Sequence, residues 1–143
     1  MFIGEYSHSV DEKGRIAVPT KFRKDLKQGA VVTRGLDGSL VLYSAKEWKV
    51  LAEKLAALPI SQANTRAFAR LMLAGAMDVK LDGQGRIILP EYLRTYSAID
   101  RKAVIAGLYN RIEIWSEDRW QAFKEKTEGN TNAIAEQLGE LGV

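Results

Sequence analysis

The amino-acid sequence predicts an α+β protein, mainly β with helices, in which two copies of one small unit pack on each other. Three observations support this fold class. A nine-residue motif occurs twice, the residues around each motif alternate between apolar and polar as in strands, and the segment between the copies has the spacing of amphipathic helices. The expected architecture is therefore two β-rich repeats joined by a helical linker.

The internal repeat is long and regular. The motif Asp-x-x-Gly-Arg-Ile-x-x-Pro stands at residues 11–19 and again at residues 82–90. A second match, offset by one more residue, joins residues 30–48 to residues 102–120. A unit of about 45 residues seldom buries enough apolar area to fold alone, so the two copies are expected to pack against each other.

Each copy is expected to begin with a hairpin. Phe2, Tyr6, His8 and Val10 recur at a period of two, and residues 15–18 continue the alternation. The connecting sequences are Asp-Glu-Lys-Gly in the first copy and Asp-Gly-Gln-Gly in the second. Both suit a tight turn, because Asp favours the first turn position and Gly accepts a positive φ.

A short helix and a second hairpin are expected next. Pro19 and Pro90 stand where proline commonly opens a helix. In the first copy, residues 30–34 and 40–44 read as strands around Gly-Leu-Asp-Gly, and their counterparts in the second copy flank Leu-Tyr-Asn. The repeated unit is thus hairpin, short helix, hairpin.

The period changes to that of a helix between the copies and again in the tail. Ser44 and Glu47 form a capping box ahead of apolar residues at helical spacing, and Pro59 ends the first of two such segments. These patterns divide the chain into repeat 1 at residues 1–47, a helical linker at 48–75, repeat 2 at 76–120 and an acidic, partly helical tail at 121–143.

Composition argues against catalysis. The chain of 143 residues has no cysteine, which excludes disulfides, thiolate metal sites and a thiol nucleophile. It has one histidine and no pair of acids at a telling spacing, so we expect no enzyme activity. Asp-Gly-Gln-Gly-Arg is too poor in carboxylates for a calcium loop. We therefore expect no catalytic residues, no metal, no cofactor and no small-molecule substrate.

The net charge of +3 is unevenly distributed. Residues 1–116 hold 18 Lys and Arg against 12 Asp and Glu, whereas residues 117–143 hold 3 against 6. A basic body permits nucleic-acid binding without requiring it. No apolar run approaches the roughly 20 residues that span a bilayer, and the opening residues lack the pattern of a secretory signal. We predict a cytoplasmic protein without a membrane partner.

The sequence resembles the MraZ family of bacterial transcriptional regulators over about residues 1–123. The resemblance lies in the twin motifs DEKGRIAVP and DGQGRIILP, the opening MFIGEYSHSVDEKGR and the stretch RGLDGSLVLYSAKEW. Two full copies at this spacing make it specific. The resemblance implies two AbrB-like swapped-hairpin β-barrel repeats that interlace within one chain as a pseudo-dimer.

The resemblance also implies a function. A protein of this family binds double-stranded promoter DNA, assembles into a ring-shaped homo-oligomer, and regulates the cluster of cell-division and cell-wall genes that contains its own gene. Its location would be the nucleoid. A series of short direct repeats in the promoter would match the regular spacing of subunits around a ring.

The motif also has a chemical reason of its own. Arg15 and Arg86 carry a rigid, permanently charged fork that can bond guanine O6 and N7 or grip a phosphate. An aspartate four residues earlier can accept a hydrogen bond from that fork and fix its direction, and a glycine lets the backbone approach a groove. We expect both turns on one face of the molecule. The expected orienting and turn residues are Asp11, Gly14, Asp82 and Gly85.

Further DNA contacts are expected from residues near the two motifs, most of them to phosphates, which position a protein without reading sequence. These residues are Lys13, Lys21, Arg23, Lys24, Gln84 and Arg94. The three lysines have uncharged counterparts in the second copy. The first copy is therefore expected to dominate the affinity for DNA.

Two alternatives stay open. Each Asp–Arg pair could serve only as a salt bridge that pins the turn, although such exposed pairs contribute about 0 to 1 kcal/mol. The chain could also be a protein-interaction module of antitoxin type, because AbrB-like domains occur in antitoxins that grip a toxin with a long disordered tail. The antitoxin interpretation ranks second, because this chain has two copies of the repeat and its tail is short, with helical periodicity.

Overall fold

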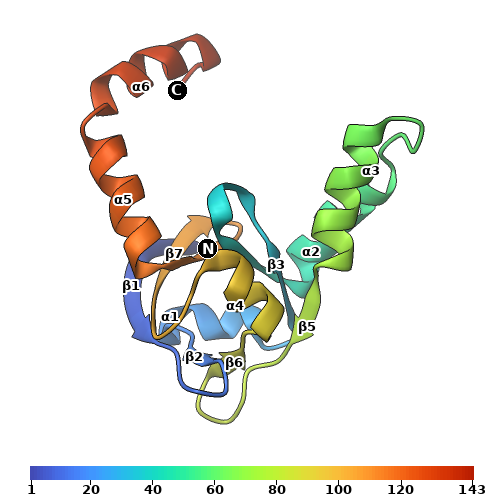
Figure 1. Ribbon diagram of the computed structural model, residues 1–143, viewed down its shortest axis with the longest axis vertical. Helices are drawn as coiled ribbons and strands as arrows, with labels where there is room; N and C mark the ends of the chain where they lie inside the picture. The colour runs from blue at the N-terminus through green and yellow to red at the C-terminus, as the bar shows by residue number, and fades with distance from the viewer.

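The computed structural model describes residues 1–143 and has the predicted α+β fold (Figure 1). The strands are β1 (Phe2–Ser9), β2 (Arg15–Ala17), β3 (Ala30–Arg34), β4 (Leu40–Ser44), β5 (Met77–Val79), β6 (Arg86–Ile88), β7 (Lys102–Tyr109) and β8 (Ile112–Ser116). The helices are α1 (Thr20–Arg23), α2 (Ala45–Ala56), α3 (Ala63–Ala69), α4 (Glu91–Ser97), α5 (Glu117–Glu128) and α6 (Thr131–Leu138).

The two copies interlace, as the family resemblance implied. Six strands form one antiparallel sheet in the order β1-β7-β8-β4-β3-β5, and β2 pairs with β6 in a separate ladder. Strands β1 to β4 belong to the first copy and β5 to β8 are their counterparts in the second. The sheet order therefore reads the same from either edge when the copies are exchanged, which is the mark of a pseudo-twofold axis between β4 and β8.

The first hairpin differs from the one predicted within each copy. The turn after β1 forms, but its two arms separate and pair with the other copy. Strand β1 pairs with β7 from Phe2 opposite Tyr109 to Ser9 opposite Lys102. Strand pairing between the two arms is limited to a single bridge from Val10 to Ile16, next to the turn, where the N–H of Asp11 donates to the carbonyl of Arg15 at 3.1 Å. The physical reason is length, since β7 offers β1 a partner of eight residues and β2 has only three.

One hydrophobic core joins the sheet, the β2–β6 ladder and the short helices. Phe2 and Tyr6 of β1 pack their rings against Phe22 in edge-to-face contacts with centroids 5.2 and 5.6 Å apart. Leu26, four residues after Phe22, is also buried. The remaining core residues come from both copies, among them Ile16, Val32, Leu40, Leu42, Ile87, Leu89, Leu93, Ile105, Ile112 and Ile114.

The second hairpins and the helix starts follow the sequence closely. In the β3–β4 hairpin Ala30 lies opposite Ser44, and β7 and β8 form its counterpart. Strand β7 runs on through Tyr109, so the second loop is shorter than predicted. Pro19 and Pro90 each directly precede a helix, α1 and α4.

Two helical arms project from the β-rich body (Figure 1). The first contains α2, which begins where Ser44 Oγ accepts from the backbone N–H of Glu47, and α3, which continues as a π-helical segment, Arg70–Ala74. The second contains α5 and α6. The tail was expected to be only partly helical, and α5 was not foreseen, although Ser116 caps it just as Ser44 caps α2.

Contacts with β1 hold the base of the second arm. Glu5 accepts from Trp120 Nε1 at 2.7 Å and from Lys124 Nζ at 3.1 Å. Beyond this base, every residue of α6 is exposed. No helix in the structure is both long and apolar enough to cross a bilayer.

Candidate nucleic-acid interface

The two motif turns are built in the same way. Asp11 Oδ1 accepts from the backbone N–H groups of Lys13 and Arg15, each at 2.9 Å. In the second copy Asp82 Oδ1 accepts from the corresponding backbone groups, at 2.8 and 2.9 Å. Each aspartate thus closes its own turn, which explains why the motif begins with this residue.

The second oxygen of each aspartate holds the arginine. Arg15 Nε donates to Asp11 Oδ2 at 2.6 Å, and Arg86 Nε donates to Asp82 Oδ2 at 2.8 Å. Neither arginine makes any other side-chain hydrogen bond, so both Nη groups of each fork are free. The side chains of Arg15 and Arg86 are 31% and 29% exposed. Each turn therefore presents an oriented guanidinium whose outer edge can bind a ligand.

Both aspartates are held in the charged form. The backbone N–H of Arg15 is the main cause of the lowered pKa of Asp11, and the side chain of Arg15 and the N–H of Lys13 add to it. The N–H of Arg86 lowers the pKa of Asp82 in the same way. The two Asp–Arg pairs are therefore intact at neutral pH.

The β2–β6 ladder places both arginines on one face. Arg15 lies opposite Ile88 and Ala17 lies opposite Arg86. Residues two apart on a strand and residues directly opposite each other share a face, so Arg15 and Arg86 point to the same side. The isoleucine after each arginine points the other way, into the core. The spacing of an antiparallel ladder puts the two arginine Cα atoms about 8 Å apart.

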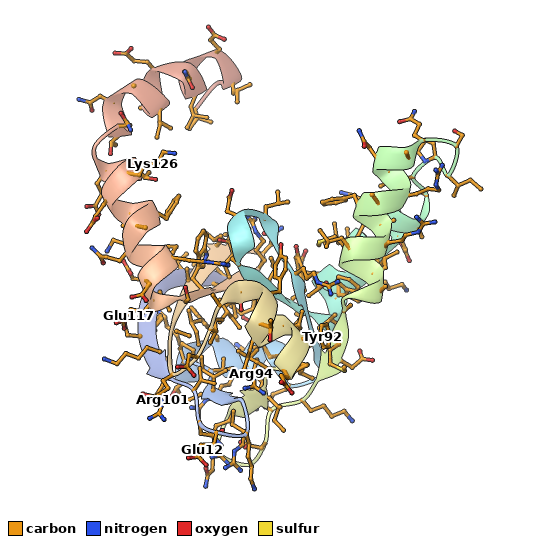
Figure 2. All side chains as sticks on the ribbon, viewed as in Figure 1. Glu12, Tyr92, Arg94, Arg101, Glu117 and Lys126 are labelled. Carbon is orange, nitrogen blue, oxygen red and sulfur yellow. The ribbon has the colours of Figure 1, made fainter.

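Figure 1 shows the two turns together at one end of the molecule, away from the helical arms. Figure 2 shows Glu12 at the tip of the first turn, with Arg94 and Arg101 toward the same end. The ladder register and the exposed fractions of Arg15 and Arg86 place these arginines outside the core and on one side, as a shared binding face requires.

Gly14 and Gly85 have a role inside the fold that the sequence did not reveal. The guanidinium of Arg23 lies against Gly85, where a Cβ would overlap it. Arg23 Nε is fixed by the carbonyl of Val18 at 2.8 Å, and the carbonyl of Gly85 accepts from the N–H of Val18 at 2.9 Å. The residue is a glycine because of this close approach and because its φ is +75°.

The same arrangement recurs in the first turn. Arg94 Nε donates to the carbonyl of Leu89 at 2.9 Å, and its guanidinium lies where a Cβ on Gly14 would be 2.9 Å from Nε. Gly14 has a φ of +83°. Arg23 and Arg94 are therefore half-buried supports, each beneath the turn of the other copy, with their Nη atoms unbonded.

The expected lysine contacts are not all at this face. Lys13 and Gln84 are exposed on the turns. Lys21 lies over the rings of Tyr6 and Phe22, with Nζ 5.2 and 5.7 Å from the centroids. Lys24 lines a pocket beside Met1 that Lys27 also lines, and it is absent from the groove beside the second turn. The structure thus does not bring Lys21 and Lys24 to the twin turns.

Two lysines near the face were missed by the sequence analysis. Lys27 and Lys80 line a groove beside the second turn together with Arg23. Lys80 stands two residues before Asp82, a position that a search for charges just ahead of the motif could have found. No cluster of three His, Asp or Glu side chains in the structure could hold a metal ion.

The repeat and the turns coincide with a known family. The family model described as "MraZ protein, putative antitoxin-like" matches residues 1–71 and matches again at residues 72–140. The chain belongs to the MraZ family. Each match contains one motif turn and one helical arm.

Its relatives in this family are similar over their full length. The "Transcriptional regulator MraZ" of Natranaerobius thermophilus is 46% identical over 143 residues, 100% of both chains. Proteins of the same name from Herpetosiphon aurantiacus and Ligilactobacillus salivarius are each 49% identical, over 100% and 96% of both chains respectively. Because these relatives are named as regulators, the prediction that the chain is not an enzyme is confirmed.

Proposed function

We propose that the protein is a transcriptional regulator that binds double-stranded promoter DNA with sequence specificity. The observation that carries this proposal is the pairing of Arg15 and Arg86 on one outer face of the β2–β6 ladder, each held by an aspartate through Nε alone. The names of the relatives agree with it.

The chemistry of the two forks suits a DNA groove. An arginine whose Nη atoms are free can bond guanine O6 and N7 bidentately, and pre-orientation by aspartate reduces the conformational entropy lost on binding. Lys13 and Gln84 flank the forks on the turn tips, and the free Nη atoms of Arg23 and Arg94 can reach phosphates beneath them. Lys21 and Lys24 lie off this face and form no part of the proposed contact.

The proposed assembly is a ring-shaped homo-oligomer on short direct repeats in the protein's own promoter, within the cell-division and cell-wall gene cluster. Exposed apolar side chains on both arms support self-association. Val50 and Ile60 are 47% and 81% exposed on the first arm, and Phe123 and Ile134 are 42% and 41% exposed on the second. Proposed localisation is the cytoplasm, on the nucleoid.

Fluorescence anisotropy with a promoter duplex and a scrambled duplex tests the DNA-binding proposal. The wild-type protein should bind the promoter duplex more tightly, and Arg15→Ala and Arg86→Ala should each remove most of that preference. Circular dichroism melts of both variants should stay close to wild type, because each pair is partly exposed. Equal affinity of the wild-type protein for both duplexes would reject sequence-specific binding.

An interaction module of antitoxin type is the second candidate. The family description contains the word antitoxin-like, and α6 is fully exposed with apolar side chains at Ile134 and Leu138. Gel filtration with and without promoter DNA separates the two. A regulator should elute as a large homo-oligomer that shifts with DNA, whereas an antitoxin should co-purify with a second, different chain.

A further inference from the structure

Three cations gather in a groove beside the second turn. Arg23, Lys27 and Lys80 line it, and its volume is about 380 Å³. Leu81, Asp82, Gly83 and Gly85 complete the lining. The groove opens next to the turn that orients Arg86, so a ligand bound there would lie beside the twin-arginine face.

The positive charges in this groove have no partners within the chain. Asp82 is its only carboxylate, and that group already accepts from Gln84 and Arg86. Lys27 and Lys80 are exposed and make no side-chain hydrogen bond or ion pair. Arg23 uses only Nε, for the carbonyl of Val18. The groove is therefore a site for an anion.

Both copies contribute to the groove because they interlace. Arg23 and Lys27 follow the first motif in the chain, whereas Lys80 precedes the second motif. Arg23 reaches across to Gly85 and so brings the basic segment of copy one to the turn of copy two. Two residues of the basic run after the first proline, Arg23 and Lys27, thus lie beside the turn of the other copy.

The cations of the groove are not repeated beside the first turn. The repeat places Ala98 where Lys27 stands, Ser9 where Lys80 stands and Glu12 where Gly83 stands. Of the three cations only Arg23 keeps a counterpart, Arg94. Arg101, whose carbonyl accepts from the N–H of Val10, adds one cation on that side, where Asp11 and Glu12 supply two carboxylates.

This difference between the two turns can determine the direction in which the protein lies along the DNA. The pseudo-twofold axis exchanges Arg15 with Arg86, so the arginine pair alone presents nearly the same face after a half-turn. Direct repeats, in contrast, have a direction. A feature that breaks the pseudo-symmetry is needed to set the orientation of each subunit on the duplex, and the groove is such a feature together with the exchange of Lys13 for Gln84.

We infer that the groove formed by Arg23, Lys27 and Lys80 binds backbone phosphates of one DNA strand beside the second turn and thereby fixes the direction in which the protein sits on its site. This inference rests on the proposed function. Lys27 and Lys80 supply the phosphate contacts, and Arg23 both supports Gly85 and offers its free Nη atoms.

The double variant Lys27→Ala/Lys80→Ala tests the phosphate contacts. Its affinity for promoter and scrambled duplexes should fall by a similar factor, about tenfold at moderate salt, and the slope of log K against log salt should shrink by about two. The matched control Lys49→Ala/Lys54→Ala removes two exposed lysines from α2 and should leave the slope unchanged. If the groove variant binds DNA as the wild-type protein does while Arg15→Ala is still defective, the inference about the groove is wrong and the proposed function stands.

Transfer of the groove provides a gain-of-function arm. The variant Ser9→Lys/Ala98→Lys, changed at two exposed positions, should have a slope of log K against log salt that is steeper than that of the wild-type protein by about two.

Competition with millimolar inorganic phosphate shows whether the anion bound in the groove is a DNA phosphate or a free phosphate. Binding of free phosphate with no change in DNA affinity of the groove variant would assign the groove to a free anion and overturn the inference.

A cleavage experiment reads the orientation directly. The chain has no cysteine, so Glu12→Cys at the tip of the first turn can carry a single iron–EDTA group. On a duplex with one binding site the labelled protein should cut on one flank, and the same label in the Lys27→Ala/Lys80→Ala background should cut on both. One-sided cutting in both backgrounds would show that the groove does not set direction. No DNA binding by the wild-type protein would instead reject the proposed function and this inference with it.

Discussion

The guanidinium of Arg23 lies directly against Gly85, although the two residues belong to different copies of the repeat. Arg94 lies against Gly14 in the same way. Each motif turn therefore rests on an arginine of the other copy, and the face that presents Arg15 and Arg86 is assembled only when the copies interlace.

Gly85→Ala should destabilise the protein. The added Cβ would overlap the guanidinium of Arg23, and the φ of +75° disfavours alanine, so we expect a loss of about 1 to 3 kcal/mol in the free energy of unfolding. Gly83→Ala in the same turn is the control, because a Cβ there meets no atom within 4 Å. Urea denaturation measures both, and equal effects of the two variants would contradict the support role of Arg23.

The Asp–Arg turns should make stability depend on acid pH. The folded-state pKa of Asp11 and Asp82 is below the ordinary value of 3.8, so their contribution is fully present above about pH 3.8 and is lost as pH falls through the lowered pKa. The melting temperature of the wild-type protein should fall as pH is lowered below 3.8. The Asp11→Asn/Asp82→Asn variant should decline less over the same range, and parallel curves would show that the turns do not contribute.

The exposed second arm should be needed for assembly and not for folding. Ile134→Asp/Leu138→Asp places two charges on α6, whose residues are all exposed. We expect the sedimentation mass to fall from that of an oligomer toward the 15.9 kDa of one chain, with the thermal melt of the body unchanged. Asn132→Asp on the same helix should keep the oligomer. A wild-type mass near 15.9 kDa would reject the ring.

Local features were predictable from the sequence because neighbouring residues determine them. Asp11 with Gly14 specified the turn, Ser44 with Glu47 specified the start of α2, and the alternation after Phe2 specified β1. The helix α5 was missed because the residues after Ser116 are strongly polar and give little apolar periodicity. The helix could have been predicted from the alignment of Ser116 with Ser44, because Ser44 was expected to cap a helix.

Partners across the fold were not predictable in the same way. A period of two shows that β1 has one buried face and does not show whether β2 or β7 pairs with it. Charge along the chain likewise grouped Lys21 and Lys24 with Arg23, yet the helical turn directs Lys21 onto Tyr6 and leaves Arg23 beneath Gly85. The reason is that interlacing sends the segments of one copy to the site of the other.

Replacement of single guanines by 7-deazaguanine, which lacks the N7 acceptor, tests most directly whether Arg15 and Arg86 read bases. Affinities of the wild-type protein and Arg15→Ala are measured on each substituted promoter duplex. At one guanine the substitution should weaken the wild-type protein by about 1 kcal/mol or more and leave Arg15→Ala unaffected, and a second guanine should behave likewise with Arg86→Ala. If every substitution weakens the variants as much as the wild-type protein, the twin arginines do not read the bases.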